Sequence, residues 1–430
     1  MERDYADEIE AGESVRAVGW LKEVRDLGSL KFMIIYDKTG EVQVTAKEGD
    51  VSDNLMENID SLNKESFISV RGKAVESEKA PGGLEVIPEE IEEVSRAPKK
   101  LPVDMSGKIG TNLDKRLDWR FLDMRRPEVR QIFQFQSKVV NLLNDFMQNQ
   151  DFTRLSFSKL TQAATEGGTD YFPVVYFNKE AFLAQSPQLY KESVLVSGLD
   201  RVYDIGPVYR AEPHHTTRHI CEYLSFDYEM IAEDLSEVLD MEEKLFKYVF
   251  KKLNQDEEAK RIMEENDVSV EPPEHIPRIT FQEANEILKE MHVETEEHDL
   301  TPEGEKKLCE HFEEKEGVPF VFVTEFPFEK KPFYIMRKGE NSSLSFDLLY
   351  NGLEITSGGI REHRYEERVK NLKDKGLDPE KFDHVRFFKY GMPPHGGLAI
   401  GIERLTQKIL ELANVREATL LPRDPKRLKP

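Results

Sequence analysis

The chain has 430 residues, of which 38% are hydrophobic and 10% aromatic, so it is long enough for two or more domains with apolar cores. No apolar run approaches the roughly eighteen residues of a membrane-spanning helix, and the acidic N-terminus does not resemble a signal or transit peptide. The two cysteines, Cys221 and Cys309, lack metal-ligand spacing. This favours a reducing, cytoplasmic setting and no membrane contact over a disulfide framework or a zinc site.

The formal net charge is −23, and residues 1–104 alone carry −10. Such a charge repels polyanions, so composition by itself argues against nucleic acid as a partner. Two explanations would reconcile it with a nucleic-acid function. The basic groups could gather on one face, or the acidic surface could be an adaptation to high salt, which screens the repulsion.

Residues 1–100 are predicted to form one small domain of short strands separated by polar or Gly-containing turns. A polar segment at 52–62 predicts a helix before the fourth strand. Five strands with one helix are typical of a Greek-key barrel such as the OB-fold, although another five-stranded barrel without a ligand fits the pattern equally well. The predicted strands are Val15–Leu21, Phe32–Tyr36, Val42–Thr45, Phe67–Arg71 and Gly83–Pro88.

A linker is predicted at 101–126, and Pro127 then suits the first turn of a long helix with one apolar stripe. Residues 127–430 are predicted to form an α+β domain, an antiparallel sheet flanked by helices. A charged helical insertion is expected around 235–315, with Thr280 and Glu283 as a capping box. Neither a Walker-type phosphate loop nor a Gly-x-Gly-x-x-Gly fingerprint after a strand is present.

Residues 208–230 predict a hairpin around a polar loop at 213–217. Alternation along a strand places Arg210 and Glu212 on one face of the first strand. It likewise groups Tyr223, Ser225 and Asp227 on the return strand. Guanidinium groups hold phosphate bidentately and an aromatic face stacks on a base, so the set suits a nucleoside triphosphate. An ordinary salt-bridged hairpin explains the same residues.

Asn351-Gly352 between apolar runs predicts a two-residue hairpin turn. In that register Leu349 pairs with Glu354, and Asp347 lies diagonal to Glu354 on the same face. Diagonal neighbours are roughly 7–8 Å apart, a gap that hydrated Mg²⁺ can bridge because it takes one or two carboxylates and keeps several waters. Two exposed carboxylates without a metal are the alternative.

Five ordered segments carry a family resemblance. The aromatic-Arg-x-Glu…Arg-His pattern at 209–219 resembles motif 2 of class II aminoacyl-tRNA synthetases, and Gly-Leu-Ala-Ile-Gly-Ile-Glu-Arg-Leu at 397–405 resembles motif 3. With Ala-Thr-Glu-Gly-Gly (164–168), Gln-Ser-Pro-Gln-Leu-Tyr-Lys-Glu (185–192) and Gly-Leu-Glu-Ile-Thr-Ser-Gly-Gly (352–359), the set is similar to aspartyl-tRNA synthetases of the archaeal and eukaryotic type, in subclass IIb. The resemblance runs from about residue 14 to residue 430.

The resemblance implies an OB-fold anticodon-binding domain at 1–100 and a class II catalytic domain at 127–430. It implies ATP-dependent ligation of L-aspartate to tRNA(Asp) through aspartyl-adenylate, with ATP as substrate, Mg²⁺ as metal, and a homodimer. It leaves open whether tRNA(Asn) is also charged. Catalysis by such an enzyme is positioning plus electrostatic stabilisation, because the substrate carboxylate is already an anion.

The family pattern also implies residue roles. Arg210, Arg218 and Arg404 are the expected catalytic arginines. Arg210 would contact the α-phosphate and Arg218 with His219 the outer phosphates, while Arg404 and Tyr223 would enclose the adenine. The full implied ATP site is Arg210, Glu212, Arg218, His219, Ile220, Tyr223, Glu354 and Arg404.

For the amino acid, the family implies that Lys191 and Arg361 meet the side-chain carboxylate, since a buried charge needs a partner. The implied aspartate site is Glu166, Gln188, Lys191, Asp227, Ser357 and Arg361, and the implied metal ligands are Asp347, Glu354 and Ser357. Because alternation places Ser357 on the opposite face from Glu354, we expect a bulge or turn at Thr356–Gly358.

In the barrel, Arg25, Phe32 and Gln43 match the family's anticodon contacts; without the family Phe32 is better explained as a core residue. Asparaginyl-tRNA synthetase is the alternative enzyme, but relatives of that type lack the lysine at Lys191, which could otherwise be a solvated helix residue. A non-catalytic RNA-binding relative is a further alternative. Three departures bear on these readings: Ser158 replaces the motif 1 proline at the dimer interface, Ile360 replaces a glutamine, and Lys22 stands where relatives vary with tRNA(Asn) acceptance.

Overall fold

The structure is a computed structural model that describes residues 2–105, 107, 110–162, 171–213 and 216–429. The chain divides into two compact units, Met1–Asp104 and Met105–Pro430. Within the described ranges, no helix is long and apolar enough to cross a membrane.

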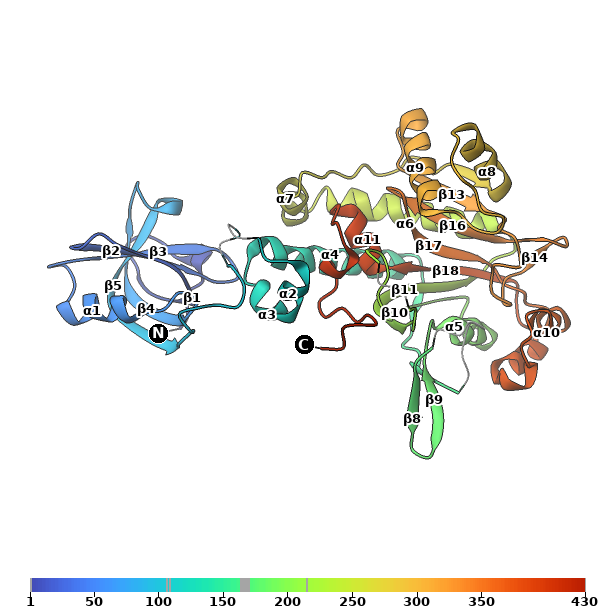
Figure 1. The fold of residues 1–430 in the computed structure, drawn as a ribbon, viewed down its shortest axis with the longest axis horizontal. Helices are drawn as coiled ribbons and strands as arrows, with labels where there is room; N and C mark the ends of the chain where they lie inside the picture. The colour runs from blue at the N-terminus through green and yellow to red at the C-terminus, as the bar shows by residue number, and fades with distance from the viewer. Residues whose placement is uncertain (1, 106, 108–109, 163–170, 214–215, 430) are drawn as a thin grey trace. The chain divides into compact units, whose positions relative to one another are not determined.

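The first unit is a closed barrel with the strand order β1-β2-β3-β5-β4 (Figure 1), which confirms the predicted OB-fold. The observed strands extend beyond the predicted ones because a barrel strand buries only one face, so polar residues such as Lys22 and Arg25 can continue β1. Ser52 caps the helix, since its hydroxyl accepts from the Leu55 N–H. The elements are β1 (Ser14–Asp26), β2 (Leu30–Tyr36), β3 (Glu41–Lys47), α1 (Asp53–Ser61), β4 (Phe67–Glu76) and β5 (Leu84–Ser95).

The second unit is built on a mixed, mainly antiparallel sheet, as predicted. Among the described residues its strand order is β12-β13-β16-β17-β18-β11-β10-β6, with parallel pairs only at β12/β13 and β6/β10. The strands are β6 (Thr153–Arg154), β10 (Arg201–Tyr209), β11 (Glu222–Ile231), β12 (Arg278–Thr280), β13 (Phe320–Thr324), β16 (Ser345–Tyr350), β17 (Leu353–Ile360) and β18 (His395–Gly401).

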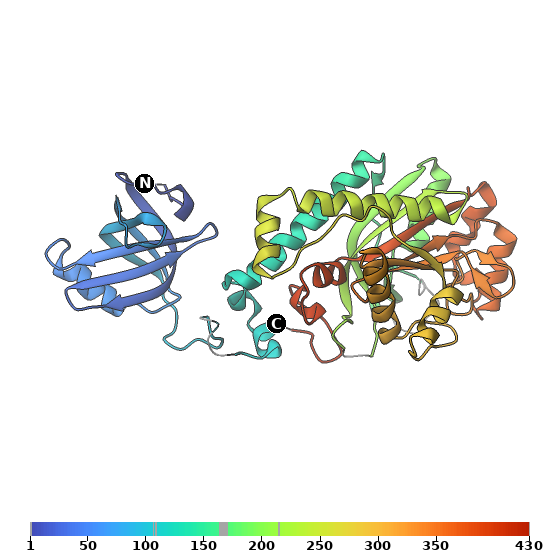
Figure 2. The same ribbon diagram turned by 90° about the horizontal axis from the view of Figure 1, so that it is seen from above.

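Helices cover the two faces of this sheet unequally. Helices α4 (Pro127–Asn149) and α6 (Leu235–Leu253) lie side by side on one face, where their apolar stripes form the main core (Figure 2). Helices α8 (Phe281–Glu290) and α9 (Pro302–Glu316) pack against the opposite face. Alternation along β13 shows this, because Phe320 and Phe322 join the first core whereas Val321 and Val323 join the second. The uncovered part of the second face is available for a site.

The remaining elements are short. The segment expected to be a linker contains two helices after Asn112, and its buried Arg120 donates to the carbonyls of Glu417 and Thr419 at 2.7 and 3.0 Å. The β8–β9 hairpin extends away from the main sheet (Figure 1). These elements are α2 (Leu113–Asp118), α3 (Arg120–Asp123), β7 (Leu160–Thr161), β8 (Pro173–Tyr176), β9 (Lys179–Leu183), α5 (Gln188–Val194), α7 (Glu257–Glu265), β14 (Arg337–Lys338), β15 (Ser342–Ser343), α10 (Tyr365–Asp374) and α11 (Ile402–Ile409).

The hairpin over 208–230 is present, but its loop is longer than predicted. Strand β10 ends at Tyr209 and β11 begins at Glu222. Arg210 still donates its N–H to the Cys221 carbonyl at 2.9 Å, so pairing continues for one hydrogen bond. The expectation that Glu212 lies on a strand is therefore wrong, because the chain leaves the ladder after Arg210.

The hairpin β16–β17 has the predicted turn and pairing. Asn351 and Gly352 both have positive φ, 46° and 77°, as a two-residue turn of this kind requires, and Leu349 pairs with Glu354. The bulge, however, lies at Ile355 and not at Thr356–Gly358, because Leu348 pairs with Thr356. This earlier bulge sets Ser357 directly opposite Asp347.

Candidate active site

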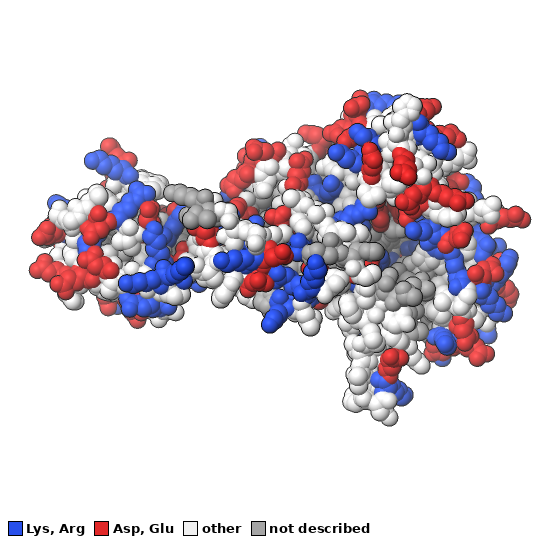
Figure 3. Space-filling view, viewed as in Figure 1, with Lys and Arg blue, Asp and Glu red and all other residues white. Residues whose placement is uncertain are grey.

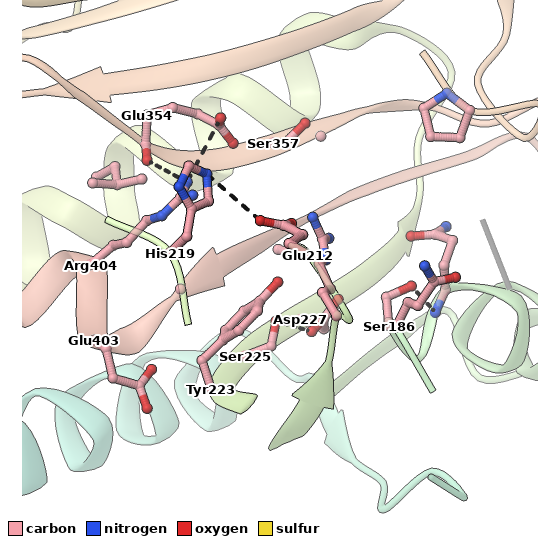
Figure 4. Close-up of a pocket in the computed structure, with 18 of the residues that line it drawn as sticks. Ser186, Glu212, His219, Tyr223, Ser225, Asp227, Glu354, Ser357, Glu403 and Arg404 are labelled. Atoms are coloured by element: carbon pink, nitrogen blue, oxygen red, sulfur yellow. Dashed lines mark hydrogen bonds and ion pairs between the residues drawn. The ribbon is translucent and has the colours of Figure 1, made fainter. Parts of the chain in front are cut away.

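A cavity of about 240 Å³ lies on the uncovered face of the sheet. Strands β11, β17 and β18, residues 210–212 and 218–220, residues 331–335 and the start of α11 contribute to its walls (Figure 4). The predicted grouping on β11 is confirmed, since Tyr223, Ser225 and Asp227 all line it. The predicted residues that the cavity brings together are Gln188, Arg210, Glu212, Arg218, His219, Ile220, Tyr223, Asp227, Glu354, Ser357, Arg361 and Arg404.

Three guanidinium groups form the positive part of the cavity wall. Arg210 follows β10, with its guanidinium carbon 5.9 Å from the centre of the Tyr223 ring. Arg404, on α11, donates from Nη1 to the Glu354 carbonyl at 3.2 Å and from Nε to the Arg218 carbonyl at 3.3 Å. Arg404 thereby ties the loop that carries Arg218 to strand β17.

The other residues of the implied ATP site lie around these arginines. Tyr223 presents its ring to the cavity, and His219 Nε2 lies 3.7 Å from a carboxylate oxygen of Glu212 (Figure 4). Ile220 contributes a mostly buried apolar surface. An aromatic ring, an apolar side chain and guanidinium groups in one hollow suit a base attached to phosphates.

A buried network of charged groups lies behind the opposite end of the cavity, where only Arg361 and Gln188 of this network line it. Arg361 donates to both carboxylate oxygens of Glu229, at 2.9 and 3.3 Å. Gln188 donates to Glu229 at 3.2 Å and to Glu192 at 2.8 Å. Arg368 in turn donates to Glu192 at 2.7 Å. The network fixes the orientation of Arg361 toward the cavity.

Lys191 lies beneath the cavity floor and is not one of its lining residues. Its side chain is fully buried, which excludes a solvated helix lysine. Its ammonium donates to Asp227 at 3.1 Å and to the carbonyls of Leu398 and Tyr228 at 3.0 and 3.3 Å. Lys191 therefore neutralises Asp227, which does line the cavity.

Asp347, Glu354 and Ser357 share one face of β16 and β17. Ser357 is paired with Asp347 across the two strands, and Glu354 lines the cavity. Burial raises the pKa of Asp347, and the Glu354 carboxylate raises it further, although Lys331 opposes the shift. Two carboxylates and a hydroxyl suit Mg²⁺, which takes oxygen ligands and keeps waters. Within the described ranges no group of three or more His, Cys, Asp and Glu side chains could hold a metal by itself.

Two carboxylates beside the predicted site residues were not predicted from the sequence. Glu305, on α9, accepts from Arg218 Nη1 at 3.3 Å with both oxygens and from the Glu354 N–H at 3.2 Å. Burial and then the nearby Glu354 raise the pKa of Glu305 to about 7. Glu403 accepts from the Leu224 N–H at 3.0 and 3.1 Å, and burial raises its pKa to about 7. The Gly-Ile-Glu-Arg segment signalled Glu403, whereas no local pattern marks Glu305.

The remaining predicted residues fall elsewhere. Glu166 lies outside the described residues. In the barrel, Arg25 pairs with Phe32 across β1 and β2, and Phe32 lies on the outer face, between the buried Lys31 and Met33. Gln43 is on β3 and donates to Thr45 and Glu85 at 3.2 and 3.0 Å. Phe32 is partly exposed, and its role as a stacking platform stays a prediction.

The three sequence departures have distinct surroundings. Ser158 is exposed and its hydroxyl bonds the backbone of Leu160. Ile360 is buried at the end of β17 within the main core. Lys22 forms an ion pair with Glu41 on the barrel surface.

Comparisons with known proteins agree with this geometry. Residues 112–425 match the family model "tRNA synthetases class II (D, K and N)", and residues 15–94 match "OB-fold nucleic acid binding domain". The chain is 46% identical to an aspartate–tRNA(Asp/Asn) ligase of Methanopyrus kandleri, over 97% of this chain and 96% of that protein. It is 44% identical to an aspartate–tRNA(Asp) ligase of Pyrococcus horikoshii, over 99% of each.

Among solved structures, asparaginyl-tRNA synthetase from Pyrococcus horikoshii, complexed with asparaginyl-adenylate, has a TM-score of 0.92. It is 29% identical and the match covers 100% of both chains. The fold is thus shared with a synthetase of different amino-acid specificity, whereas the more similar sequences are aspartate–tRNA ligases. The chain belongs to the class II tRNA synthetases of the D, K and N group.

Proposed function

We propose that this protein is an ATP-dependent aspartate–tRNA ligase that forms aspartyl-adenylate and then transfers aspartate to tRNA(Asp). The observation that carries the proposal is one cavity with three arginines at one end and a cation–carboxylate network behind the other. The full-length similarity to aspartate–tRNA ligases supports the same activity. Asparaginyl-tRNA synthetase and a non-catalytic relative are not favoured, because the chain is 44–46% identical to two full-length aspartate ligases and the charged residues of the cavity are intact.

In the activation step, a carboxylate oxygen of aspartate attacks the α-phosphorus of ATP and pyrophosphate leaves. Negative charge on the phosphate oxygens increases in the transition state, and fixed positive groups stabilise it. Arg210 would hold the α-phosphate, and Arg218 with His219 would hold the outer phosphates. Tyr223 and Arg404 would enclose the adenine from opposite sides. No protein nucleophile is required, so the residues act by orientation and charge.

Selection of aspartate would depend on Arg361 and Asp227. Asp227 and Gln188 would receive the substrate ammonium, and Arg361 would hold the side-chain carboxylate. Hydrogen bonds between ionised groups are roughly twice as strong as neutral ones, so a carboxylate is preferred to the amide of asparagine. Lys191 would contribute from beneath the floor, where it balances Asp227.

Asp347, Glu354 and Ser357 would hold Mg²⁺, which supplies positive charge to the phosphate oxygens when it is bound. Glu354 also lies against Arg404, 3.8 Å from its Nη1, so the metal ligands and the adenine-binding arginine are fixed to each other. The oxygen-only donor set is the observation that supports magnesium over a softer metal.

The barrel would bind the anticodon through Arg25, Phe32 and Gln43, with Phe32 stacking on an unpaired base. Aspartate–tRNA ligases for tRNA(Asp) alone and for both tRNA(Asp) and tRNA(Asn) are similar to this chain, so charging of tRNA(Asn) is part of the test. A homodimer, which the resemblance implies, stays a prediction for sedimentation analysis.

The test compares ATP–pyrophosphate exchange with aspartate and with asparagine, followed by charging of tRNA(Asp) and tRNA(Asn) transcripts. We expect exchange with aspartate only, and charging of tRNA(Asp). Arg210→Ala serves as the inactive control, because it lacks the group expected at the α-phosphate. Exchange with asparagine and not with aspartate would contradict the proposal.

A further inference from the structure

Lys331 occupies a position that the sequence did not suggest. It lines the cavity, and its ammonium donates to both carboxylate oxygens of Asp347 at 2.8 Å. The Nζ atom also lies 4.0 Å from the centre of the Phe326 ring, a cation–π contact. The Lys331 side chain is only 12% exposed. The Lys331 ammonium is thus held by two groups, the Asp347 carboxylate and the Phe326 ring.

Asp347 needs such a partner. It is buried and lies in the negative field of Glu354, and a buried carboxylate without a counter-ion is costly. Because Lys331 donates to both oxygens, a metal that used Asp347 as a ligand would place its positive charge close to the ammonium, and the repulsion would weaken both contacts. The ammonium and the divalent cation therefore compete for one carboxylate.

We infer that Lys331 is a displaceable counter-ion for Asp347, which makes divalent-metal binding depend on nucleotide. This inference rests on the proposed function, because it concerns the magnesium site of that proposal. Without nucleotide, a metal on Asp347 must weaken the Lys331–Asp347 pair, because the two cations repel each other. With ATP in the cavity, phosphate oxygens replace the lost carboxylate as acceptors for Lys331, which lines the same cavity. Metal and ATP then bind cooperatively, because each lowers the free-energy cost of separating Lys331 from Asp347 for the other.

Lys330 supplies a matched control. It is the adjacent residue, it carries the same charge, and it pairs with Asp299 at 3.0 Å, with its side chain 55% exposed. Lys330→Met changes the net charge of the protein by the same amount as Lys331→Met. The comparison therefore separates loss of the local counter-ion from a general increase in negative charge, which attracts any cation.

The experiment measures Mn²⁺ binding without nucleotide by electron paramagnetic resonance, with Mg²⁺ as competitor. We expect Lys331→Met and the milder Lys331→Gln to lower the Kd for Mn²⁺ about tenfold, equivalent to about 1.4 kcal/mol, whereas Lys330→Met matches the unmodified protein. Addition of a non-hydrolysable ATP analogue should tighten Mn²⁺ binding strongly in the unmodified protein and only weakly in Lys331→Met. Circular dichroism confirms that each variant is folded.

A double variant tests whether the gain in Mn²⁺ affinity depends on Asp347. In Asp347→Asn, the additional change Lys331→Met should give no tighter Mn²⁺ binding, because the shared carboxylate is gone. Equal Mn²⁺ affinity in Lys331→Gln, Lys331→Met and the unmodified protein would overturn the inference, and so would a gain that persists in Asp347→Asn. Aspartate-dependent pyrophosphate exchange by the unmodified protein tests the proposed function separately, so the two failures are distinguishable.

Discussion

Glu305 links two groups that a triphosphate would contact. Its carboxylate holds Arg218 through the guanidinium and Glu354 through the backbone N–H, and Arg404 closes the ring by bonding the carbonyls of both residues. A change at Glu305 would therefore alter the orientation of Arg218 without touching ATP. Glu305 is best described as a positioning residue for the phosphate end of the cavity.

We expect Glu305→Gln to raise the KM for ATP in pyrophosphate exchange about tenfold, with a smaller change in kcat. The amide keeps the shape and can still accept from Glu354, but it loses the charge that orients Arg218, and hydrogen bonds to charged groups contribute about 1.5–3 kcal/mol. Glu303→Gln, an exposed substitution in the first turn of the same helix, is the control. An equal KM in both variants would show that Glu305 does not position Arg218.

Lys191→Met should abolish aspartate-dependent exchange while ATP binding, measured by calorimetry, persists. The substitution leaves the buried Asp227 without the ammonium that balances it, and breaking a buried pair costs about 3–5 kcal/mol of stability. The double variant Lys191→Met with Asp227→Asn should recover much of that stability but no exchange, because the group expected to receive the substrate ammonium is neutral. Undiminished exchange in the single variant would show that Lys191 is not required for the activation of aspartate.

Most cavity residues could be predicted because they belong to contiguous motifs, for example Arg210 and Arg404. Lys331, which also lines the cavity, and Glu305, which bonds two lining residues, could not be predicted. Glu305 is 87 residues from Arg218 and 49 from Glu354, and Lys331 is 16 residues from Asp347 in an irregular segment. Their contacts depend on how α9 and the 325–336 segment pack on the sheet, which local patterns do not encode.

At the level of elements, helix α6 places an unexpected glutamate between itself and the sheet. Glu242 is fully buried on this helix, and its carboxylate interacts with the Thr356 hydroxyl. Burial raises its pKa to about 8; the Thr356 hydroxyl opposes the shift, and Asp347 on the far side of the sheet adds to it. The apolar period of the helix was predicted, but the charged composition of 235–265 suggested a solvated surface, so a buried glutamate was not expected.

Glu242 makes stability depend on pH. Its pKa in the folded protein lies above the value of about 4.3 in an unfolded chain, so the folded state holds a proton that the unfolded chain releases. The free energy of unfolding should therefore fall as pH rises between those values, by up to about 1.4 kcal/mol per pH unit. Glu242→Gln should flatten this slope in urea titrations at pH 5.5, 6.5 and 7.5, whereas the exposed Glu264→Gln should not. If the free energy of unfolding of Glu242→Gln depends on pH as steeply as that of the unmodified protein, Glu242 is not the source of the pH dependence.

The β16–β17 hairpin shows how far element-level prediction reached. The turn and the Leu349–Glu354 pairing followed from Asn351-Gly352 and the alternation. The bulge at Ile355 did not, because a bulge position depends on which side chains both faces of the sheet can accommodate. Ile355 is the extra residue of the bulge, and its side chain is buried in the main core on the α6 face.

On the scale of the whole molecule, the surface of the barrel bears on the negative net charge, and its visible face does not separate acidic from basic groups (Figure 3). Figure 3 shows acidic and basic side chains intermixed on the visible face of the barrel, and this unit carries −10 of the total −23. On this face, phosphate attraction by a basic surface is therefore a weak source of affinity. RNA binding by the barrel would have to depend more on base stacking, which tolerates a negative net charge.

Because the barrel and the cavity belong to different units, we expect Phe32→Ala to impair the charging of tRNA without affecting the activation of aspartate. The two units have their own cores, and the cavity lies wholly in the second, so aspartate-dependent pyrophosphate exchange should be unchanged. The KM for tRNA(Asp) should rise at least fivefold, since stacking contributes about 1–3 kcal/mol per base. Val94→Ala, an exposed apolar residue on β5, should change neither. An unchanged KM for tRNA in Phe32→Ala would mean that the ring is not a stacking platform, and reduced exchange would mean that the barrel influences activation.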